Sequence, residues 1–493
     1  SYTYAELDDL ASRLAVSLSN MGVSKGSPVV VQTAQSAETA ISHMAIYKLG
    51  AIVVTLSHLA GPDAFAHIIN DCKPSVIITH SDHWNSLRDT ASNLKSLQFC
   101  IVCGTPESDD LSFDELLTTS SEQFEPVITA TEDPAVLMYT SGATGSPKGV
   151  LLSHRSGHCY RPTLNLVYNL ELDAPGSVFW TPSDWAWSGG LYDLCFPAWQ
   201  HGQTVVSTHR RFSADWAFDF MARHQVTHSF MTATALKRLA EVANPRSKWN
   251  LAMRVVCTSG ESLPREILRW CEEDFGIVCN ELYGLTEFTD MIGCCKRLFP
   301  TKPGSMGRAF PGRYVAIIDE NGVEQADGVV GEVASLLEDD PTLILGYWGN
   351  PGVPDNLKLG KWLTTGDLAI RDEDGYFWFQ CRKDDLIKSA GYRIGPTEIE
   401  DTLESHPDVA EAVIVGKPDP ERGTAVMAFV RLASGVKEND ATRTRLQQHV
   451  KNNLAVYEYP RYIEFVDSFP RTYTGKIKRD LLRQRAASNS KSE

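Results

Sequence analysis

The sequence contains no run of apolar residues that approaches the roughly 18 needed by a membrane-spanning helix. The opening residues Ser1 to Glu6 also lack the basic and apolar segments of a secretory leader. These absences predict a cytoplasmic protein without a membrane span. Positive charge is scarce as well, because 46 Lys and Arg are outnumbered by 62 Asp and Glu, for a formal net charge of −16. An acidic surface disfavours nucleic acids and anionic membranes as partners.

Zinc and disulfide patterns are scarce too. The 13 histidines include no His-Glu-x-x-His, which removes the commonest hydrolytic zinc motif. Eleven cysteines, an odd number, are scattered along the chain, as is typical of a reducing compartment. The adjacent Cys294 and Cys295 fit buried small hydrophobes better than a disulfide, because neighbouring residues rarely bond without strain.

The composition that is present, 43% hydrophobic and 22% charged over 493 residues, is typical of a globular enzyme of several domains. In the first half, short buried strands alternate with helices, which predicts two doubly wound α/β layers. Thr3 and Glu6 fit a capping box at the start of the first helix. Further strands are expected at 28–31, 51–54, 76–79, 203–207, 227–231 and 253–259, and helices at 37–49, 216–224 and 264–275.

From about Pro311, β-rich segments are separated by Asp-Glu-Asn-Gly and Asp-Glu-Asp-Gly turns, which predict a β-rich subdomain of local hairpins. A compact α+β pattern follows, with helices expected at 396–406 and 443–453 and strands at 409–415, 425–431 and 462–466. We therefore predict an N-terminal domain over 1–383 and a small mobile C-terminal domain over 384–493.

The loop at 139–150 follows an apolar strand and combines glycines, hydroxyl residues and a lysine. Such a loop brings backbone N–H groups, hydroxyls and one positive charge close to a polyphosphate, which a merely flexible surface loop would not require. It is not a Walker A motif, because Gly142 and Gly145 are three apart and Lys148 precedes Gly149. The predicted phosphate-binding residues are Thr140, Ser141, Gly142, Ala143, Thr144, Gly145 and Lys148.

This loop resembles the phosphate loop of the adenylate-forming superfamily, which includes acyl-CoA synthetases, luciferases and peptide-synthetase adenylation domains. Further segments resemble the superfamily in the same order, and the C-terminal ones look most like medium-chain acyl-CoA synthetases and their bacterial relatives. The resemblance implies the adenylate-forming enzyme fold. The matching segments lie at 259–262 (adenine side), 283–287 (Tyr-Gly-x-Thr-Glu), 365–367 (ribose), 382–388 with 391–394 (hinge) and 470–477 (C-terminal catalytic loop).

The resemblance also implies roles for single residues. Lys476 bridges the substrate carboxylate and the α-phosphate, and Glu287 and Thr140 hold Mg²⁺ with hard oxygen atoms. Taken alone, Lys476 is an exposed lysine, Glu287 a solvated carboxylate and Asp367 a turn aspartate. The remaining implied residues are Thr286 (catalytic), Glu261, Tyr283, Gly284, Asp367 and Arg382 (nucleotide), Asp384 (hinge), and Gly391, Tyr392 and Arg393 (coenzyme A).

Two steps are implied: a carboxylic acid and Mg-ATP give acyl-AMP and pyrophosphate, and a thiol then displaces AMP. Because no carrier domain follows Lys476, free coenzyme A is the expected acceptor. A ligase that loads a carrier protein and a luciferase-like enzyme remain alternatives, and homodimer formation is left open. A degenerate nucleotide-binding regulator is disfavoured because Lys148, Glu287, Asp367, Arg382 and Lys476 are all present.

The acid is expected to be larger than acetate, either of short to medium chain length or aromatic. Acetyl-CoA synthetases resemble this chain but carry tryptophan at the position of Gly284, so glycine predicts a longer pocket. We assign Trp185, Gly284 and Leu285 to that pocket, although packing in the second α/β layer explains each tryptophan equally well. The chain departs from the superfamily at Cys381, where glycine is usual, and at Leu285, where close relatives have glutamine.

Overall fold

The computed structural model describes residues 1–119, 124–140, 147–338, 340–389, 392–420, 422–455, 457–471 and 477–488. Two compact units share these residues. The first comprises Ser1–Val315 and Leu336–Lys361, and the second comprises Ala316–Ser335 and Trp362–Glu493. The β-rich segments at 316–335 and 362–383 therefore pack with the C-terminal residues. The predicted hinge between Lys383 and Asp384 lies inside the second unit and stays a prediction.

The first unit begins with a nine-stranded sheet in the order β18-β17-β7-β6-β2-β1-β3-β4-β5. Neighbouring strands are parallel from β6 to β5 in this order. Strand β6 pairs antiparallel with β7. The strands are β1 Pro28–Gln32, β2 Ile52–Thr55, β3 Val76–His80, β4 Phe99–Cys103, β5 Leu111–Ser112, β6 Pro134–Thr140, β7 Lys148–Ser153, β17 Gly346–Tyr347 and β18 Asn350–Pro351.

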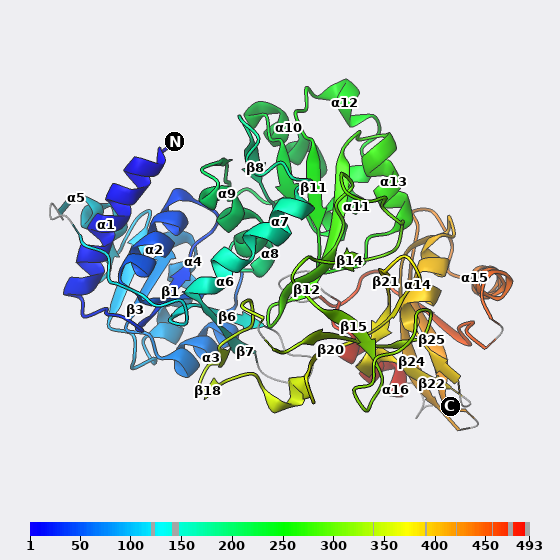
Figure 1. The fold of residues 1–493 in the computed structure, drawn as a ribbon. Coiled ribbons are helices and arrows are strands. Elements are labelled where there is room, and N and C mark those ends of the chain that lie inside the picture. Colours follow the sequence, from blue (N-terminus) through cyan, green and yellow to red (C-terminus); the bar gives the residue numbers. More distant parts are fainter. Residues whose placement is uncertain are drawn as a thin grey trace. The chain divides into compact units, whose positions relative to one another are not determined.

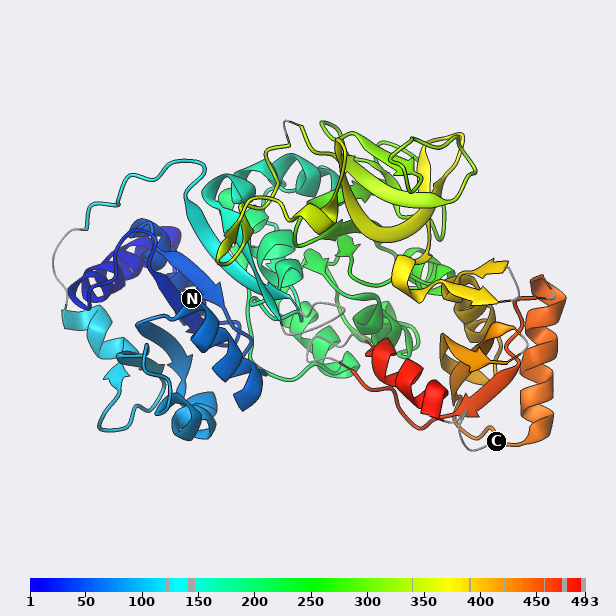
Figure 2. The ribbon, with the colours of Figure 1, turned by 90° about the horizontal axis from the view of Figure 1, so that it is seen from below.

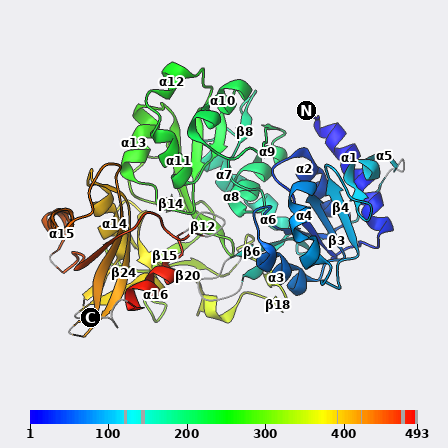
Figure 3. The ribbon, with the colours of Figure 1, turned by 180° about the vertical axis from the view of Figure 1, so that it is seen from behind.

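Helices cover both faces of this sheet (Figures 1 and 3). Side chains of β1 alternate between the faces, so Val29 and Val31 pack with α1, α2 and α5 while Val30 packs with α3 and α4. Thr3 caps the first helix in a complete capping box, as predicted. The helices are α1 Tyr4–Asn20, α2 Ala37–Lys48, α3 Pro62–Cys72, α4 Ser81–Ala91 and α5 Phe113–Thr119; α3 and α4 were not predicted.

Seven strands of a second, twelve-stranded sheet lie in the same unit, in the order β14-β13-β12-β11-β10-β8-β9, and they are parallel from β12 to β9. One apolar cluster joins Val136 and Val150 of the first sheet to Phe179 and Val255 of the second. The strands are β8 Val178–Trp180, β9 Thr204–Val205, β10 His228–Phe230, β11 Val255–Thr258, β12 Val278–Leu285, β13 Thr289–Gly293 and β14 Gly307–Ala309. The helices are α6 His154–Cys159, α7 Arg161–Val167, α8 Ser188–Gly190, π-helical η1 Leu191–Cys195, α9 Phe196–Gln200, α10 Ala214–His224, α11 Ala233–Ala240, α12 Pro245–Lys248 and α13 Arg265–Glu273. The prediction of two doubly wound layers is confirmed.

The second unit combines long antiparallel hairpins with a small α+β body. Its antiparallel strands β24 and β25 bury one face under α14 and α15 and the other under α16, and Figure 2 shows α15 (orange) and α16 (red) on opposite sides of these strands. The elements are β15 Val315–Ile318, β16 Gly331–Leu336, β20 Trp362–Arg371, β21 Tyr376–Arg382, η3 Lys383–Asp385, β22 Ile387–Ser389, β23 Tyr392–Ile394, α14 Pro396–Glu404, β24 Val409–Asp419, β25 Gly423–Leu432, α15 Asp440–Asn453, β26 Tyr462–Phe465 and α16 Arg479–Ser488. Among the described residues no helix is both long and apolar enough to cross a bilayer.

Candidate active site

The predicted phosphate loop connects two paired strands. Thr140 at the end of β6 lies opposite Lys148 at the start of β7, and Tyr139 lies opposite Gly149. A Cβ atom at Gly149 would lie 2.9 Å from Leu137 Cδ1 and 3.0 Å from Tyr139 Cζ, so a side chain there would have to displace these two side chains. Register therefore places Thr140 beside Lys148. The residues predicted between them, Ser141, Gly142, Ala143, Thr144 and Gly145, lie outside the described residues.

Helix α3 fixes the base of this hairpin. The Tyr139 hydroxyl donates a 2.6 Å hydrogen bond to Asp71 Oδ2, and burial raises the pKa of the Tyr139 phenol, so the phenol remains a donor. His67 Nε2 lies 2.9 Å from the carbonyl oxygen of Pro147. Both partners come from a helix that sequence reasoning missed. Hydrogen-bond partners on one helix thus hold the described residues on both sides of the loop.

Tyr347 on β17 connects Lys148 to Glu287. The Lys148 Nζ atom lies 5.4 Å from the centroid of the Tyr347 ring, and the Tyr347 hydroxyl donates a 3.0 Å hydrogen bond to Glu287 Oε1. Burial, together with the Glu287 carboxylate, raises the pKa of the phenol. The Lys148 ammonium and the Glu287 carboxylate, which are far apart in the sequence, therefore both contact the Tyr347 side chain. Sequence reasoning missed Tyr347, and nothing in its local pattern marks it.

Glu287 lies in the turn of the β12–β13 hairpin, where Leu285 pairs with Thr289. Thr289 has φ +62°, an uncommon value for a β-branched residue. Arg313 holds this turn: its guanidinium donates to the carbonyl of Phe288 at 2.9 Å and to Thr289 Oγ1, and it pairs with Asp340 at 3.0 Å. Both members of this ion pair are buried. The position of Glu287 is thus set by a strained, well-anchored turn, in which the half-buried Thr286 also lies.

The glycine at 284 has a structural cause that the sequence did not reveal. Gly284 pairs with Asp290, and a Cβ at 284 would lie 2.3 Å from the Thr289 carbonyl oxygen. The backbone of β13 therefore demands glycine irrespective of the acid. Tyr283, Gly284 and Leu285 lie half-buried at the end of β12. Glycine at 284 therefore does not by itself indicate how long the acid pocket is.

Trp185 and Trp187, in the aromatic segment after β8, lie in different surroundings. Trp185 is buried in the core, with its ring 5.7 Å from that of Trp199, which fits the packing alternative. Trp187 instead lies against the predicted adenine-side loop, because a Cβ at Gly260 would be 3.2 Å from the Trp187 ring. In that loop Glu261 Oε2 accepts from the N–H and hydroxyl of Thr234 in the first turn of α11. These two hydrogen bonds hold the Glu261 side chain at the N-terminal end of α11.

A pair of buried carboxyls, Asp193 of η1 and Asp290 of β13, lies near Gly284. Burial raises the pKa of Asp290 to about 7, while the Arg313 guanidinium opposes that shift, and burial together with Asp290 raises the pKa of Asp193 well above its ordinary value. The two groups therefore retain at least one proton between them at neutral pH. Sequence reasoning missed this pair.

In the second unit, Asp367 and Arg382 lie together on paired strands β20 and β21, with 3.2 Å between Arg382 Nε and Asp367 Oδ1. Gly366, at φ +75°, precedes the aspartate and donates its N–H to Glu332 Oε1 at 2.9 Å. The Asp367 carboxylate is buried and the arginine is more exposed. The predicted ribose and nucleotide residues are thus neighbours.

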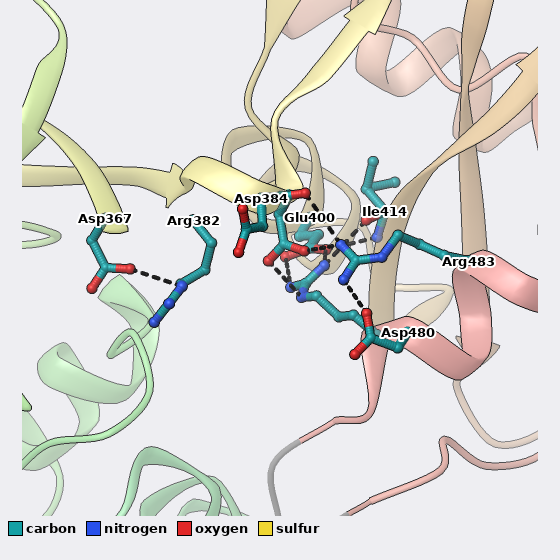
Figure 4. A network of polar contacts seen from close by, with 9 residues as sticks. Asp367, Arg382, Asp384, Glu400, Ile414, Asp480 and Arg483 are labelled. Atoms are coloured by element: carbon teal, nitrogen blue, oxygen red, sulfur yellow. Dashed lines mark hydrogen bonds and ion pairs between the residues drawn. The ribbon is translucent and has the colours of Figure 1, made fainter. Parts of the chain in front are cut away.

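The predicted hinge and coenzyme A residues are described in part. Asp384 lies in η3, directly after β21 (Figure 4). Tyr392 on β23 is half exposed and stacks on Tyr457, with 4.2 Å between ring centroids. Cys381, the departure from the superfamily, is buried on β21. Gly391 and Lys476 lie outside the described residues, as does the side chain of Arg393.

The described residues contain no group of three or more His, Cys, Asp or Glu side chains that would hold a metal by themselves. Thr140 and Glu287 instead offer one hydroxyl and one carboxylate, the hard oxygen ligands that suit Mg²⁺. Mg²⁺ is commonly bound by one or two such groups together with substrate phosphates. The donor chemistry of these two residues therefore fits a nucleotide-bound Mg²⁺.

Comparisons with known proteins match nearly the whole chain. A family model described as AMP-binding enzyme matches residues 1–348, and one described as AMP-binding enzyme C-terminal domain matches residues 398–476. An uncharacterised acyl-CoA ligase, YtcI of Bacillus subtilis strain 168, is 34% identical over 98% of this chain and 90% of its own. The mitochondrial acyl-coenzyme A synthetase ACSM4 of Mus musculus is 33% identical over 98% of this chain and 84% of its own. The crystal structure of the anthranilate CoA ligase AuaEII with anthranoyl-AMP superposes with a TM-score of 0.89, at 28% identity, over 99% of this chain and 93% of that one.

Proposed function

The chain belongs to the AMP-binding enzyme family and is an AMP-forming acyl-CoA ligase, and we propose that it activates a carboxylic acid larger than acetate. In the first half-reaction the acid attacks the α-phosphorus of ATP, giving acyl-AMP and pyrophosphate. In the second, the thiol of coenzyme A attacks the acyl carbon and AMP leaves. The observation that supports the ATP-binding part of this reaction is the contact of Lys148 and Glu287 through Tyr347, which presents a cation and a carboxylate together.

In the first half-reaction, the hydroxyl and amide groups of 140–145 and the Lys148 ammonium bind the phosphates, and Asp367 accepts hydrogen bonds from the ribose hydroxyls. Thr140 and Glu287 hold Mg²⁺. When bound, this ion neutralises charge on the phosphate oxygens. Lys476 stabilises the negative charge that builds on the α-phosphate in the transition state. Arg382, which pairs with Asp367, contacts the nucleotide.

In the second half-reaction a thiol must reach an anhydride that water would otherwise hydrolyse. We propose that the C-terminal segment turns about Asp384, withdrawing Lys476 and presenting Gly391, Tyr392 and Arg393 to coenzyme A. Glycine at 391 admits the pantetheine arm because it has no side chain, and Arg393 supplies charge for a phosphate. The stacked pair Tyr392 and Tyr457 offers an exposed aromatic surface.

The acid is proposed to be of short to medium chain length or aromatic. Support comes from the likeness to an anthranilate CoA ligase. Gly284 lends less support than its residue type suggested, because strand packing alone requires it.

The test measures AMP release from Mg-ATP with acetate, butyrate, octanoate, benzoate and 2-aminobenzoate, with and without coenzyme A. We expect release that depends on coenzyme A and is greater for an acid beyond acetate. Lys476→Ala should lower acid-dependent pyrophosphate exchange by about 10²- to 10³-fold, whereas Gly391→Leu should spare exchange and block thioester formation. Exchange without thioester in the wild type would favour loading of a carrier protein, and silence with every acid would refute the proposal.

A further inference from the structure

The hinge segment is anchored in opposite directions on its two sides. Upstream, Arg382 pairs with Asp367 of β20 at 3.2 Å, and Lys383 Nζ pairs with Glu332 of β16 at 2.9 Å. Both partners belong to the β-rich strands. The chain up to residue 383 is therefore tied to that sheet by side-chain ion pairs.

Downstream, the partners come from helix α16 instead. Arg483 Nη1 donates to the carbonyl oxygen of Asp384 at 3.4 Å and forms an ion pair with the Asp385 carboxylate. Arg479 Nε lies 3.8 Å from the other oxygen of Asp385. Figure 4 shows this change of partner between Arg382 and Asp384. Arg382 and Lys383 thus pair with the β-rich strands, whereas Asp384 and Asp385 contact α16, and the change occurs between residues 383 and 384.

Helix α16 is itself fixed to the C-terminal body. Arg479 makes two hydrogen bonds to Glu400, at 2.7 and 2.8 Å, and Glu400 Oε1 accepts from the N–H of Ile414 at 2.7 Å. Leu482 of the helix is buried against β24 and β25. Arg483 therefore connects the hinge to a helix that cannot shift without disturbing a buried core.

The same helix directly follows the segment that contains Lys476. The described residues that flank 472–476 lie together, because the N–H of Lys478 donates to the carbonyl of Pro470 at 2.8 Å and Arg471 forms an isolated β-bridge with Ile477. The helix begins at Arg479, immediately after this closed base. A connection from Asp385 through Arg483 thus reaches the base of the lysine segment within one helix.

We propose that Arg483 is a positioning residue that confines the bend to the junction of residues 383 and 384, so that helix α16 turns with Asp384 and Asp385 as one body. This proposal rests on the proposed function, which requires the turn. Without Arg483, the bend spreads into 384–386 and the lysine is placed less accurately. Misplacement of a reacting group by about 1 Å costs up to 10²-fold in rate. Nucleotide contacts upstream of the hinge stay intact.

The test compares Arg483→Ala with Arg485→Ala. Arg485 lies on the same helix and pairs with Glu464 of β26, inside the C-terminal body and away from the hinge. We expect Arg483→Ala to lower kcat for acid-dependent pyrophosphate exchange about tenfold while the KM for ATP changes less than about twofold. Tryptic cleavage after Arg382 in the free protein should accelerate several-fold. Arg483→Lys should restore part of the rate, and Arg485→Ala should match the wild type.

Equal effects of the two alanine variants, or a raised KM with unchanged cleavage, would overturn the proposal. If Arg483→Ala does not fold, Asp385→Asn removes the same ion pair from the other side; the same loss of kcat supports the proposal and wild-type behaviour refutes it. Failure of the proposed function is separate, because the wild type would then show no acid-dependent pyrophosphate exchange, while the cleavage rates would still reveal whether Arg483 confines the hinge.

Discussion

The hairpin that holds Glu287 and the segment that holds Asp384 illustrate two ways of placing a functional residue. In the hairpin, backbone pairing between β12 and β13 and the buried cation Arg313 set the position. At the hinge, partly exposed arginines hold the chain through ion pairs. Buried pairs are costly to break, whereas exposed ones exchange readily with water. The first arrangement suits the metal ligand proposed at Glu287, and the second suits the turn proposed at Asp384.

Removing the arginine from each region gives the sharpest contrast. Arg313→Met leaves Asp340 buried without its cation and frees the Thr289 turn, so we expect a loss of about 3 to 5 kcal/mol in unfolding free energy and little remaining pyrophosphate exchange. Arg483→Met should cost less than about 1 kcal/mol. Urea denaturation followed by tryptophan fluorescence measures both. Similar losses in the two variants would contradict the distinction.

Tyr347→Phe tests whether the hairpin carboxylate needs its phenol. The variant keeps the ring beneath Lys148 and loses one hydrogen bond to Glu287, so we expect a roughly three- to tenfold lower kcat/KM and a higher Mg²⁺ concentration for half-maximal rate. Tyr4→Phe, which removes a hydroxyl donating to the Gln203 carbonyl, is the matched control. An unchanged Mg²⁺ requirement would mean that Glu287 is held by its turn alone.

Salt should loosen the hinge and leave the hairpin intact. Raising NaCl from 0.05 to 0.5 M shortens the Debye length to a few ångströms, which weakens exposed ion pairs far more than buried ones. We expect tryptic cleavage after Arg382 to accelerate about twofold, after correction for the protease with an unstructured peptide. Cleavage that does not respond would show that the hinge is held by something other than charge.

The buried pair Asp193 and Asp290 gives the smallest expected effect. The native protein holds the Asp290 proton up to about pH 7, whereas the unfolded chain releases it near the ordinary aspartate pKa, so this group favours folding at low pH and loses that contribution as pH rises to about 7. Asp290→Asn should therefore raise the melting temperature by roughly 2 °C more at pH 8 than at pH 5.5. The exposed Asp109→Asn should show no such difference. An equal shift at both pH values would indicate that the pair does not titrate there.

Much of the architecture was predictable because buried apolar residues recur at the spacing of the helix or strand that contains them. Strands at 28–31 and 76–79 and the helix at 37–49 follow from apolar spacing, capping and turn residues. Helix α3 was missed although Pro62 stands at its first turn and Phe65, Ile68, Ile69 and Cys72 recur at helical spacing. That pattern was sufficient to find it.

The site was predictable where chemistry sits in short motifs and not where distant strands supply the partners. The Thr140 and Lys148 pair and the Asp367 and Arg382 pair join residues that motifs had already marked. Tyr347 and Arg313 matter through contacts with segments far along the chain, which no local pattern encodes. Gly284 was found from its motif, and the structure adds a reason for glycine that the sequence did not give, the close approach of the β13 backbone. The longer acid pocket stays a prediction.

Strand β17 has a consequence for synthesis of the chain. It pairs with β7, although nearly two hundred residues separate them. Until the ribosome has made Tyr347, β7 is the outer strand of the first sheet, and its unpaired backbone groups are open to another nascent chain. The late arrival of β17 therefore completes both the sheet and the contact to Glu287, so the step that ends the exposure of this edge also assembles the site.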